Sequence, residues 1–373
     1  MPMLSGIVFA PLLLVGLLPA SDESSDVQAQ AGADARRLIE IDRAVSRGLA
    51  YLVRGQLEAG CWSGQVGHKQ GDGYVVLDPT RQGLEGEGHL GVTALAGLSL
   101  LADGHVPDRG RYAEVLNRII DYLIRHSNQM GYLCDNETRM YSHAFGTLFL
   151  AQVHGMSSTR APQVEATLRK AVGFIEATQN RSGGWRYTPF TWETDLSVTV
   201  CQVQALRAAR NTGIHVNKAC IDRVIDYVER SRIQSGELEG AFYYKIEGRA
   251  ARTKTSFTIN AAAATSLHSA GVYDAARYGR AIEFLEEHYE EISRYYPDHY
   301  YFWYGNYYAA QAMHLEGGRR FERYYKRLSA ELLSRQRLDG SWSNSVGPGD
   351  SFATAMACLL LRIPAQYLPI FQR

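Results

Sequence analysis

The sequence lacks an excess of either charge, a long apolar segment and a regular set of cysteines, and each absence excludes a class of protein. Lys plus Arg and Asp plus Glu number 39 each among 373 residues, which gives no indication of binding to nucleic acid or to an anionic membrane surface. No apolar run approaches the roughly 20 residues of a transmembrane helix. The five cysteines are scattered, without disulfide framework or Cys-x-x-Cys spacing. We therefore expect no nucleic-acid partner, no transmembrane span, no metal site and no cofactor.

The N-terminal residues have the pattern of an export signal. An apolar run from Gly6 to Leu18 ends in Pro19-Ala20, which is typical of a secretory signal peptide over residues 1–20. A buried first helix is the alternative, because no Lys or Arg precedes the run. Residues 21–34 are small and polar, which predicts a disordered leader. The main domain is expected over residues 35–373, in a protein exported to the periplasm or the medium.

One pattern of seven positions, Gln-x-x-x-Gly-x-Trp, occurs three times. The copies are Gln56/Gly60/Trp62, Gln179/Gly183/Trp185 and Gln336/Gly340/Trp342. A basic residue, a small residue and an aromatic–aliphatic pair precede the first two copies at equal spacing. A shared pattern of this length marks an internal repeat. The aromatic–aliphatic pair recurs about every fifty residues and indicates six units. The first unit carries a Gly-rich insertion over residues 63–88.

Two kinds of predicted helix alternate along the chain. Residues Ala113 to Ile124 have apolar side chains at helical spacing on one side and charge on the other. Segments such as Val92–Leu101 and Phe352–Leu361 are apolar nearly all round and must be buried. Strand-like patterning is scarce, although Ala241 to Ile246 fits a small hairpin. We predict an all-α fold, an (α/α)6 toroid of six helical hairpins with an inner ring of helices inside an outer ring. An open solenoid is the alternative, but the last apolar helix lacks the polar cap it would need.

Polar residues stand near the start of the apolar helices, four positions before a Thr in four units. The pairs are His89/Thr93, His143/Thr147, Asp195/Thr199 and Asp350/Thr354. Equivalent positions in a closed ring lie at one end of a central cavity, and positions i and i+4 share a helix face. This arrangement predicts a site with Asp195 and His143 as catalytic residues and with His89 and Asp350 contacting a ligand. The alternative is structural, because Asp often caps a helix and a buried His is often only hydrogen-bonded.

Aromatic residues gather near two of these helix starts. Residues 295–304 are dense in Tyr and Trp, and further rings crowd the turn after Gly183. Rings in such numbers cannot all face the core, although core packing explains many of them. Aromatic walls hold isoprenoid chains, stabilise carbocations or stack on sugars. The residues expected at the cavity are Trp185, Tyr187, Asp298, Tyr301, Trp303 and Tyr304.

The repeated Gln-x-x-x-Gly-x-Trp motif, with its basic and aromatic lead-in, resembles the motif of squalene and oxidosqualene cyclases. From about Ala35 to Arg373 the six-unit layout resembles the α/α toroid that terpenoid cyclases share with the β subunits of protein prenyltransferases, the prenyltransferase and squalene oxidase repeat proteins. The segment Asp298–Trp303 is similar to the prenyltransferase stretch Asp-x-Cys-Tyr-x-Phe-Trp with one residue missing. The resemblance implies the toroid fold and an apolar, isoprenoid-type ligand.

The sequence also departs from that family. It contains no Asp-x-Asp-Asp motif, so Asp195 stands alone where the cyclases have their acid, and Tyr300 stands about where the prenyltransferase zinc ligand Cys belongs. We therefore expect a secreted toroid that binds an apolar small molecule in its central cavity, with residual cyclase-type acid chemistry at Asp195 as an extension of that hypothesis. The alternatives are a non-catalytic binding or interaction module and a glycan-processing (α/α)6 enzyme with paired carboxylates.

Overall fold

The computed structural model describes residues 22–70, 73–76 and 88–372 of a chain that divides into two compact units, one up to Asp42 and one from Arg43 onwards. In the first unit residues 22–42 are helical and begin α1 (Asp22–Arg54). The leader predicted as disordered over residues 21–34 is thus described as helix from Asp22. Its Ala, Gln and Glu residues favour a helix, and no Pro interrupts it. The predicted signal peptide, residues 1–20, lies outside the described residues.

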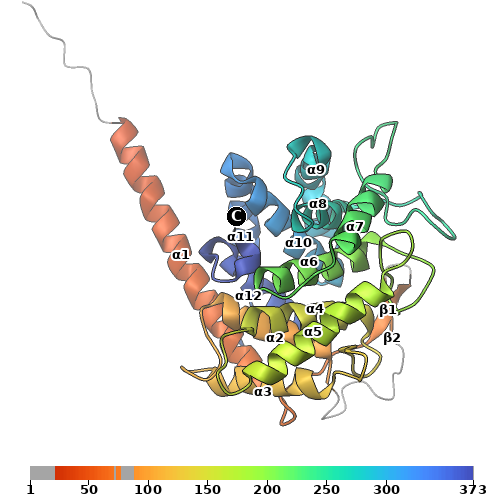
Figure 1. Cartoon of the computed structure of the whole chain (residues 1–373). Helices are drawn as coiled ribbons and strands as arrows, with labels where there is room; N and C mark the ends of the chain where they lie inside the picture. Colours follow the sequence, from red (N-terminus) through yellow and green to blue (C-terminus); the bar gives the residue numbers. More distant parts are fainter. Residues whose placement is uncertain (1–21, 71–72, 77–87, 373) are drawn as a thin grey trace, which may run out of the picture. The chain divides into compact units, whose positions relative to one another are not determined.

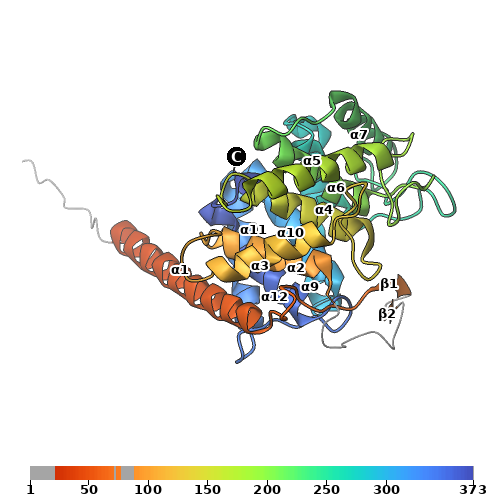
Figure 2. The same cartoon turned by 60° about the horizontal axis from the view of Figure 1, so that its bottom comes forward.

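Six apolar helices of the second unit form an inner ring (Figures 1 and 2). They are α2 (Leu90–Ala102), α4 (Arg139–Val153), α6 (Leu196–Asn211), α8 (Phe257–Ser269), α10 (Tyr300–Glu316) and α12 (Asp350–Arg362). Each packs against the next, and α12 packs against α2, which closes the ring. Every residue of α2 is buried, as expected for a helix without a polar face. The predicted closed toroid is confirmed, and an open solenoid is excluded.

Amphipathic helices alternate with the inner ones along the chain and pack outside them (Figure 2). They are α3 (Ala113–Arg125), α5 (Ala161–Thr178), α7 (Lys218–Arg230), α9 (Gly279–Tyr295), α11 (Gly318–Arg335) and the part of α1 from Arg43. In α3 the buried residues Leu116, Ile119, Ile120 and Leu123 lie on the predicted apolar stripe. Because outer and inner helices alternate, all six inner helices run in one direction, and their N-terminal ends lie together at one end of the ring.

Irregular segments at this end of the ring depart from the helical pattern. The predicted insertion holds two short antiparallel strands, β1 (Gly67–Gln70) and β2 (Gly73–Val76). The segment Ala241–Ile246, predicted as a small hairpin, forms no strand and is held by an isolated bridge between Arg232 and Phe242. It belongs to a long excursion between α7 and α8 that projects at the right of Figure 1.

The Gln of the repeated motif ties each unit to the next outer helix. Gln336 Nε2 donates to the carbonyl of Gly340 at 2.9 Å and to that of Ala44 on α1 at 2.8 Å. Arg47 on α1 donates to its Oε1. In the other two copies the Gln makes matching bonds to carbonyls of α3 and α7. The motif that marks the repeat in the sequence therefore also bonds the last of the six repeats to the first.

Glycine is required at the centre of this turn. Gly183 and Gly340 have φ of +98° and +94°, in the region that favours glycine. A Cβ at Gly183 would lie 2.1 Å from the carbonyl oxygen of Arg223, and one at Gly340 would lie 2.5 Å from that of Arg47. The turn thus needs a residue without a side chain both for its conformation and for its close approach to the neighbouring outer helix.

Candidate functional site at the N-terminal ends of the inner helices

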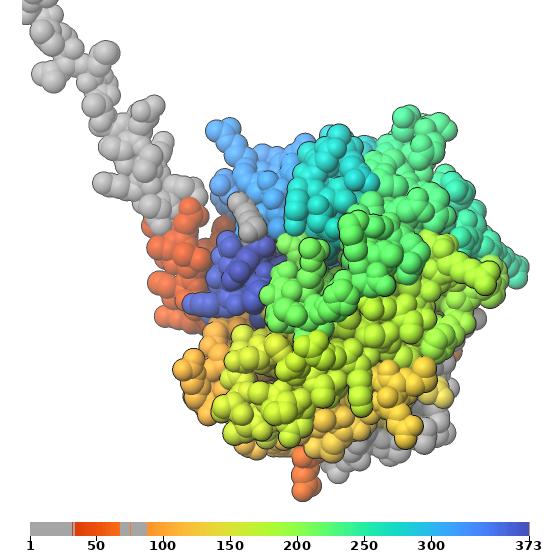
Figure 3. All heavy atoms as spheres, viewed as in Figure 1, coloured from red at the N-terminus to blue at the C-terminus, as the bar shows by residue number. Residues whose placement is uncertain are grey.

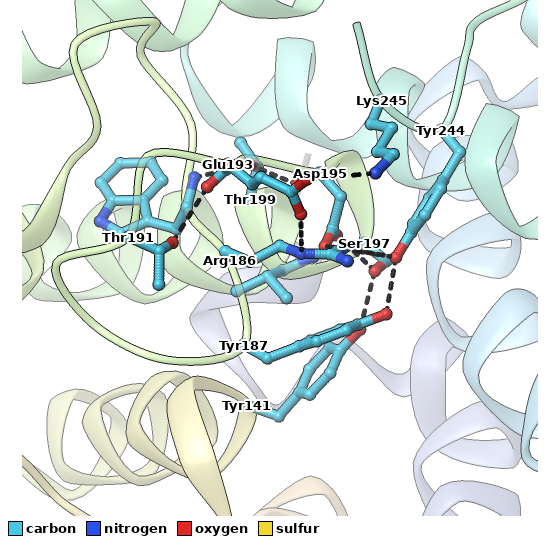
Figure 4. Close-up of polar contacts among 12 residues, drawn as sticks. Tyr141, Arg186, Tyr187, Thr191, Glu193, Asp195, Ser197, Thr199, Tyr244 and Lys245 are labelled. Atoms are coloured by element: carbon cyan, nitrogen blue, oxygen red, sulfur yellow. Dashed lines mark hydrogen bonds and ion pairs between the residues drawn. The ribbon is translucent and has the colours of Figure 1, made fainter. Parts of the chain in front are cut away.

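Asp195 caps the N-terminus of α6 and is fully buried. Its Oδ1 accepts hydrogen bonds from the backbone N–H of Val198 at 2.8 Å and from Ser197 Oγ at 2.6 Å. Its Oδ2 accepts from the guanidinium of Arg186 and from the hydroxyl of Tyr244 at 3.3 Å (Figure 4). The carboxylate accepts every one of these bonds, so its contacts suit a charged partner of Arg186 better than an acid that donates a proton.

Arg186 is the centre of the polar contacts around Asp195. Its side chain is only 18% exposed, and it also pairs with Glu193 at 3.5 Å. It donates to Tyr244 Oη at 2.8 Å and lies 4.2 Å over the ring centroid of Tyr187. Burial opposes its charge, but the carboxylate of Asp195 raises the pKa of Arg186 above its ordinary value. The guanidinium therefore remains a cation that contacts a buried carboxylate and the rings of Tyr187 and Tyr244.

Three tyrosines complete the cluster. The hydroxyls of Tyr187 and Tyr244 are 2.6 Å apart, and that of Tyr141 lies 2.7 Å from Ser197 Oγ. Burial and then the charge of Asp195 raise the pKa of Tyr187 to about 12, and burial also raises the pKa of Tyr141 and Tyr244. All three phenols are thus neutral at physiological pH. We call this cluster the tyrosine site: Tyr141, Arg186, Tyr187, Asp195 and Tyr244.

The tyrosine site is assembled from three segments that are far apart in the sequence. Tyr141 lies on α4, Tyr187 lies between α5 and α6, and Tyr244 lies between α7 and α8. The backbone positions these loops: Met140 N–H donates to the carbonyl of Tyr187 at 2.9 Å, and Leu196 N–H to that of Tyr244 at 3.0 Å. Each loop is thereby fastened to the start of an inner helix, and the side chains converge at that end of the ring.

Below the tyrosine site the middle of the ring is filled by side chains. Tyr304 on α10 donates to the carbonyl of Ser197, and its ring centroid lies 6.0 Å from that of Tyr141 on α4. One turn further along, Phe145 and Tyr307 make a similar contact at 6.1 Å. Helices α4 and α10 stand on opposite sides of the ring, so these contacts cross it. The ligand space that we predicted in the central cavity is occupied at this level, which leaves the tyrosine site at the N-terminal end.

His143, predicted as a catalytic residue, faces away from the tyrosine site. Helix α4 begins at Arg139, one turn earlier than the pairing of His143 with Thr147 predicted. The Nδ1 of His143 accepts from Leu133 N–H at 3.1 Å, and its ring lies 5.0 Å from that of Phe174 on α5. Burial lowers the pKa of His143 to about 3, so the ring is neutral at physiological pH. It takes the place of the Thr that accepts the corresponding N–H in other units.

His89 and Asp350 also make their hydrogen bonds within their own turns. His89 caps α2 by accepting from Val92 N–H at 3.2 Å, and burial lowers its pKa. Asp350 is the first residue of α12, accepts from Asn344 N–H at 2.9 Å and pairs with Arg337. Of the four polar residues predicted to converge, only Asp195 belongs to the tyrosine site.

Some of the residues predicted for the aromatic wall lie in the core, and others lie at the end of the ring that carries Asp195. Trp185 and Trp303 are buried, and their indole N–H groups donate to main-chain carbonyls at 2.8 and 3.1 Å, so both belong to the core. Asp298 is exposed, and its carbonyl accepts from Val346 N–H at 3.2 Å. Tyr301 is the second residue of α10. The structure therefore brings Tyr187, Tyr301 and Tyr304 to the end of the ring where Asp195 lies.

Sequence reasoning missed Arg186, Tyr141 and Tyr244. Arg186 follows the motif Trp directly, where the other two copies have Ser63 and Ser343. A cation at that position was a visible departure from the repeat. Tyr244 lies in the strand-like segment that the sequence singled out, but its place beside Asp195 depends on the loop between α7 and α8.

The part of the chain that the structure describes holds neither a candidate metal cluster nor a candidate membrane span. No three His, Cys, Asp or Glu side chains there are close enough to hold a metal ion. No helix in the same ranges is both long and apolar enough to cross a membrane.

Comparisons with known proteins support the fold. No protein-family model matches the sequence, and no curated protein matches it either. A variant of the type II terpene cyclase MstE from Scytonema is similar in structure, with 14% identity, TM-score 0.55 and coverage of 90% of this chain and 99% of that one. D-mannose isomerase has 14% identity, TM-score 0.58 and coverage of 86% and 96%. An inactive variant of an α-1,6-mannanase of Salegentibacter sp. HEL1_6, in complex with α-1,6-mannotriose, has 7% identity, TM-score 0.59 and coverage of 86% and 98%. At these identities the likeness shows the (α/α)6 toroid and not the activity.

Proposed function

We propose that this toroid is an exported protein that binds a small molecule with an apolar, isoprenoid-type body at the tyrosine site. The observation that carries the proposal is the convergence of Tyr141, Tyr187 and Tyr244 from three segments at one end of the ring, joined there by Tyr304. Tyr141, Tyr187 and Tyr244 are neither core residues nor freely exposed; they are half-buried. Rings in that state offer a partly dry aromatic surface, which suits an apolar ligand.

The hydroxyls of these tyrosines are already engaged, which favours an apolar ligand over a polar one. Tyr187 and Tyr244 bond each other, Tyr141 bonds Ser197, and Tyr304 bonds the carbonyl of Ser197. A sugar needs free donors and acceptors to replace its bonds to water, because an unpaired polar group in a closed site costs about 1–3 kcal/mol. The ring faces remain for the ligand, and such faces accept hydrocarbon chains and cationic groups.

The contacts of Asp195 favour binding over cyclase-type acid catalysis. A general acid needs a proton on its carboxyl group and a path to the reacting atom. Asp195 accepts four hydrogen bonds, one of them from the guanidinium of Arg186, and it is fully buried. Its role in the proposal is to fix Arg186, which in turn lies over the ring of Tyr187.

One observation favours a second candidate, a glycan-processing toroid. Trp192 and Phe190 are 68% and 62% exposed in the loop that leads to Asp195, and an exposed indole is a platform on which sugars stack. The two carboxylates nearby, Glu193 and Asp195, both pair with Arg186. Glycosidases instead need one carboxyl group to stay protonated, so the isoprenoid-type ligand is the first choice.

A titration of intrinsic fluorescence with farnesol, geranylgeraniol and α-1,6-mannotriose tests both candidates. We expect the isoprenoid alcohols to bind, and Tyr187→Ala and Tyr141→Ala to weaken binding at least about tenfold because each removes a ring face. Tyr273→Ala, an exposed residue at the other end of the ring, is the control and should change nothing. Binding of mannotriose alone would establish the second candidate, and binding of none of the three would overturn the proposal.

The export part of the proposal has its own measurement. The apolar run Gly6–Leu18 and the Pro19-Ala20 that follows support cleavage near residue 20. Intact mass of the protein recovered outside the cytoplasm should give an N-terminus between Ser21 and Ala31. Recovery of the uncleaved chain from the cytosol would contradict it.

A further inference from the structure

Exposed apolar side chains gather at the end of the ring that carries the tyrosine site. Met130 and Leu338 lie at the tips of turns between outer and inner helices, and Leu338 is fully exposed. Phe190 and Trp192 lie in the loop between α5 and α6 that leads to Asp195. Phe190 has φ of +59°, a conformation that a bulky residue rarely adopts. Large apolar groups held outwards in this way indicate a surface that meets another phase or partner.

A basic loop stands beside these aromatic residues. Residues 245–254, in the excursion between α7 and α8, carry the exposed cations Arg249, Arg252 and Lys254. The fourth cation, Lys245, is paired with Glu193 at 3.6 Å. The segment contains one acid, Glu247. Two backbone hydrogen bonds, Tyr244 N–H to the carbonyl of Lys254 and Arg252 N–H to that of Lys245, hold the loop in shape. It stands out at the right edge of the surface in Figure 3.

The basic loop and the aromatic loop form one continuous surface. The backbone at Gly248 packs against the side chains of the aromatic loop, since a Cβ there would lie 3.2 Å from the indole of Trp192 and 2.4 Å from Glu193 Oε1. Exposed cations and exposed aromatic rings thus lie side by side at the N-terminal end of the inner helices. We call residues 190–192 and 249–254 together the aromatic–basic face.

We propose that the aromatic–basic face docks on a lipid bilayer that contains anionic lipids. Phe190 and Trp192 would enter the interfacial layer, where amphipathic aromatic rings are favoured. Arg249, Arg252 and Lys254 would meet lipid phosphates, at about 1 kcal/mol for each cation near the surface. The balanced net charge of the chain gave no indication of such a surface, because a net charge does not say where the cations lie.

This inference rests in part on the proposed function, because an isoprenoid-type ligand dissolves in the bilayer and would reach the tyrosine site directly from it. The charge and aromatic pattern support docking independently of that ligand. A nucleic acid or an acidic protein would be drawn to the same cations, but the exposed rings of Phe190 and Trp192 beside them favour the bilayer.

Co-sedimentation with vesicles tests the proposal. We expect the protein to sediment with phosphatidylcholine vesicles that contain phosphatidylglycerol, far less with pure phosphatidylcholine, and less as salt rises. The double variant Arg249→Glu/Arg252→Glu should lower partitioning at least about tenfold, and Phe190→Ser/Trp192→Ser should lower it as well. Tyr273→Ser/Arg109→Glu, at the opposite end of the ring, is the matched control and should bind as the parent does.

Circular dichroism should show that all three variants keep the helical fold. Binding by the parent to pure phosphatidylcholine only, an equal loss in the control, or binding to an oligonucleotide or acidic peptide without binding to vesicles would each overturn the proposal. Farnesol titration without vesicles separates the two proposals, because Arg249→Glu/Arg252→Glu should retain farnesol binding while losing the vesicles.

Discussion

Asp195 and Asp350 occupy the same position in two repeats, four residues before a Thr, and yet their surroundings differ completely. Both follow a Gln-x-x-x-Gly-x-Trp turn with matching hydrogen bonds from Trp to Thr. Asp195 is fully buried and accepts from Arg186, whereas the side chain of Asp350 is 34% exposed and pairs with Arg337. The repeat therefore sets the backbone, and the loops inserted between its fixed points set the chemistry.

The largest difference between the two units should appear when the cations are removed. Arg186→Met leaves the carboxylate of Asp195 buried without its partner, which should destabilise the fold by about 3–5 kcal/mol. Arg337→Met removes an exposed partner and should cost about 0–1 kcal/mol. Chemical denaturation measures both. Arg186→Met combined with Asp195→Asn is the control and should recover much of the loss, because no charge is then buried alone. Equal costs at the two sites would contradict the comparison.

The shared part of the two turns should respond equally to substitution. Gly183→Ala and Gly340→Ala each place a Cβ against a backbone carbonyl at positive φ, so both should destabilise by about 2–4 kcal/mol. Gly173→Ala in α5, where nothing lies within 4 Å of the new Cβ, should be neutral or stabilise by about 0.5–1 kcal/mol. Thermal and urea unfolding measure these differences. A cost at only one motif glycine would show that the two turns are not equivalent.

The Thr that accepts the Trp N–H should also contribute equally in both units. Thr199→Val and Thr354→Val keep the shape of the side chain but remove the hydroxyl that accepts the backbone N–H of Trp185 and of Trp342. In both turns the backbone nitrogen lies 3.1 Å from the hydroxyl oxygen. A buried donor left without a partner costs about 1–3 kcal/mol. Thr188→Val, on the exposed loop, is the control. If Thr199→Val cost no more than Thr188→Val, the proposed equivalence of the turns would fail.

The same contrast explains how much the sequence could predict. The repeat, the alternation of helices and the closed ring follow from local patterns, because Gln336 and Gly340 carry the same physical requirements as their counterparts in the first unit. Asp195 was found because it stands at a helix start. Arg186 and Tyr244 were missed because their contacts with it depend on loops that no periodicity describes. His143 lies apart from the tyrosine site because α4 begins one turn earlier than the pattern suggested, which turns the side chain towards α5.

His143 extends the comparison to a third unit, and its titration has no expected effect at neutral pH. It accepts the N–H of Leu133 where other units use a Thr, and burial lowers its pKa to about 3. In the unfolded chain its pKa is about 6.5, so between these values the unfolded state binds a proton that the folded state does not. Stability should therefore fall as the pH drops from about 6.5 towards 3, by up to about 1.4 kcal/mol per pH unit from this residue.

His143→Asn keeps an acceptor for Leu133 and does not titrate. Chemical denaturation between about pH 4 and about pH 6 should therefore show that its free energy of unfolding depends less steeply on pH than that of the parent. His215→Asn, at an exposed position, should leave the slope unchanged. A slope in His143→Asn as steep as in the parent would show that this buried ring is not what makes the fold sensitive to acid.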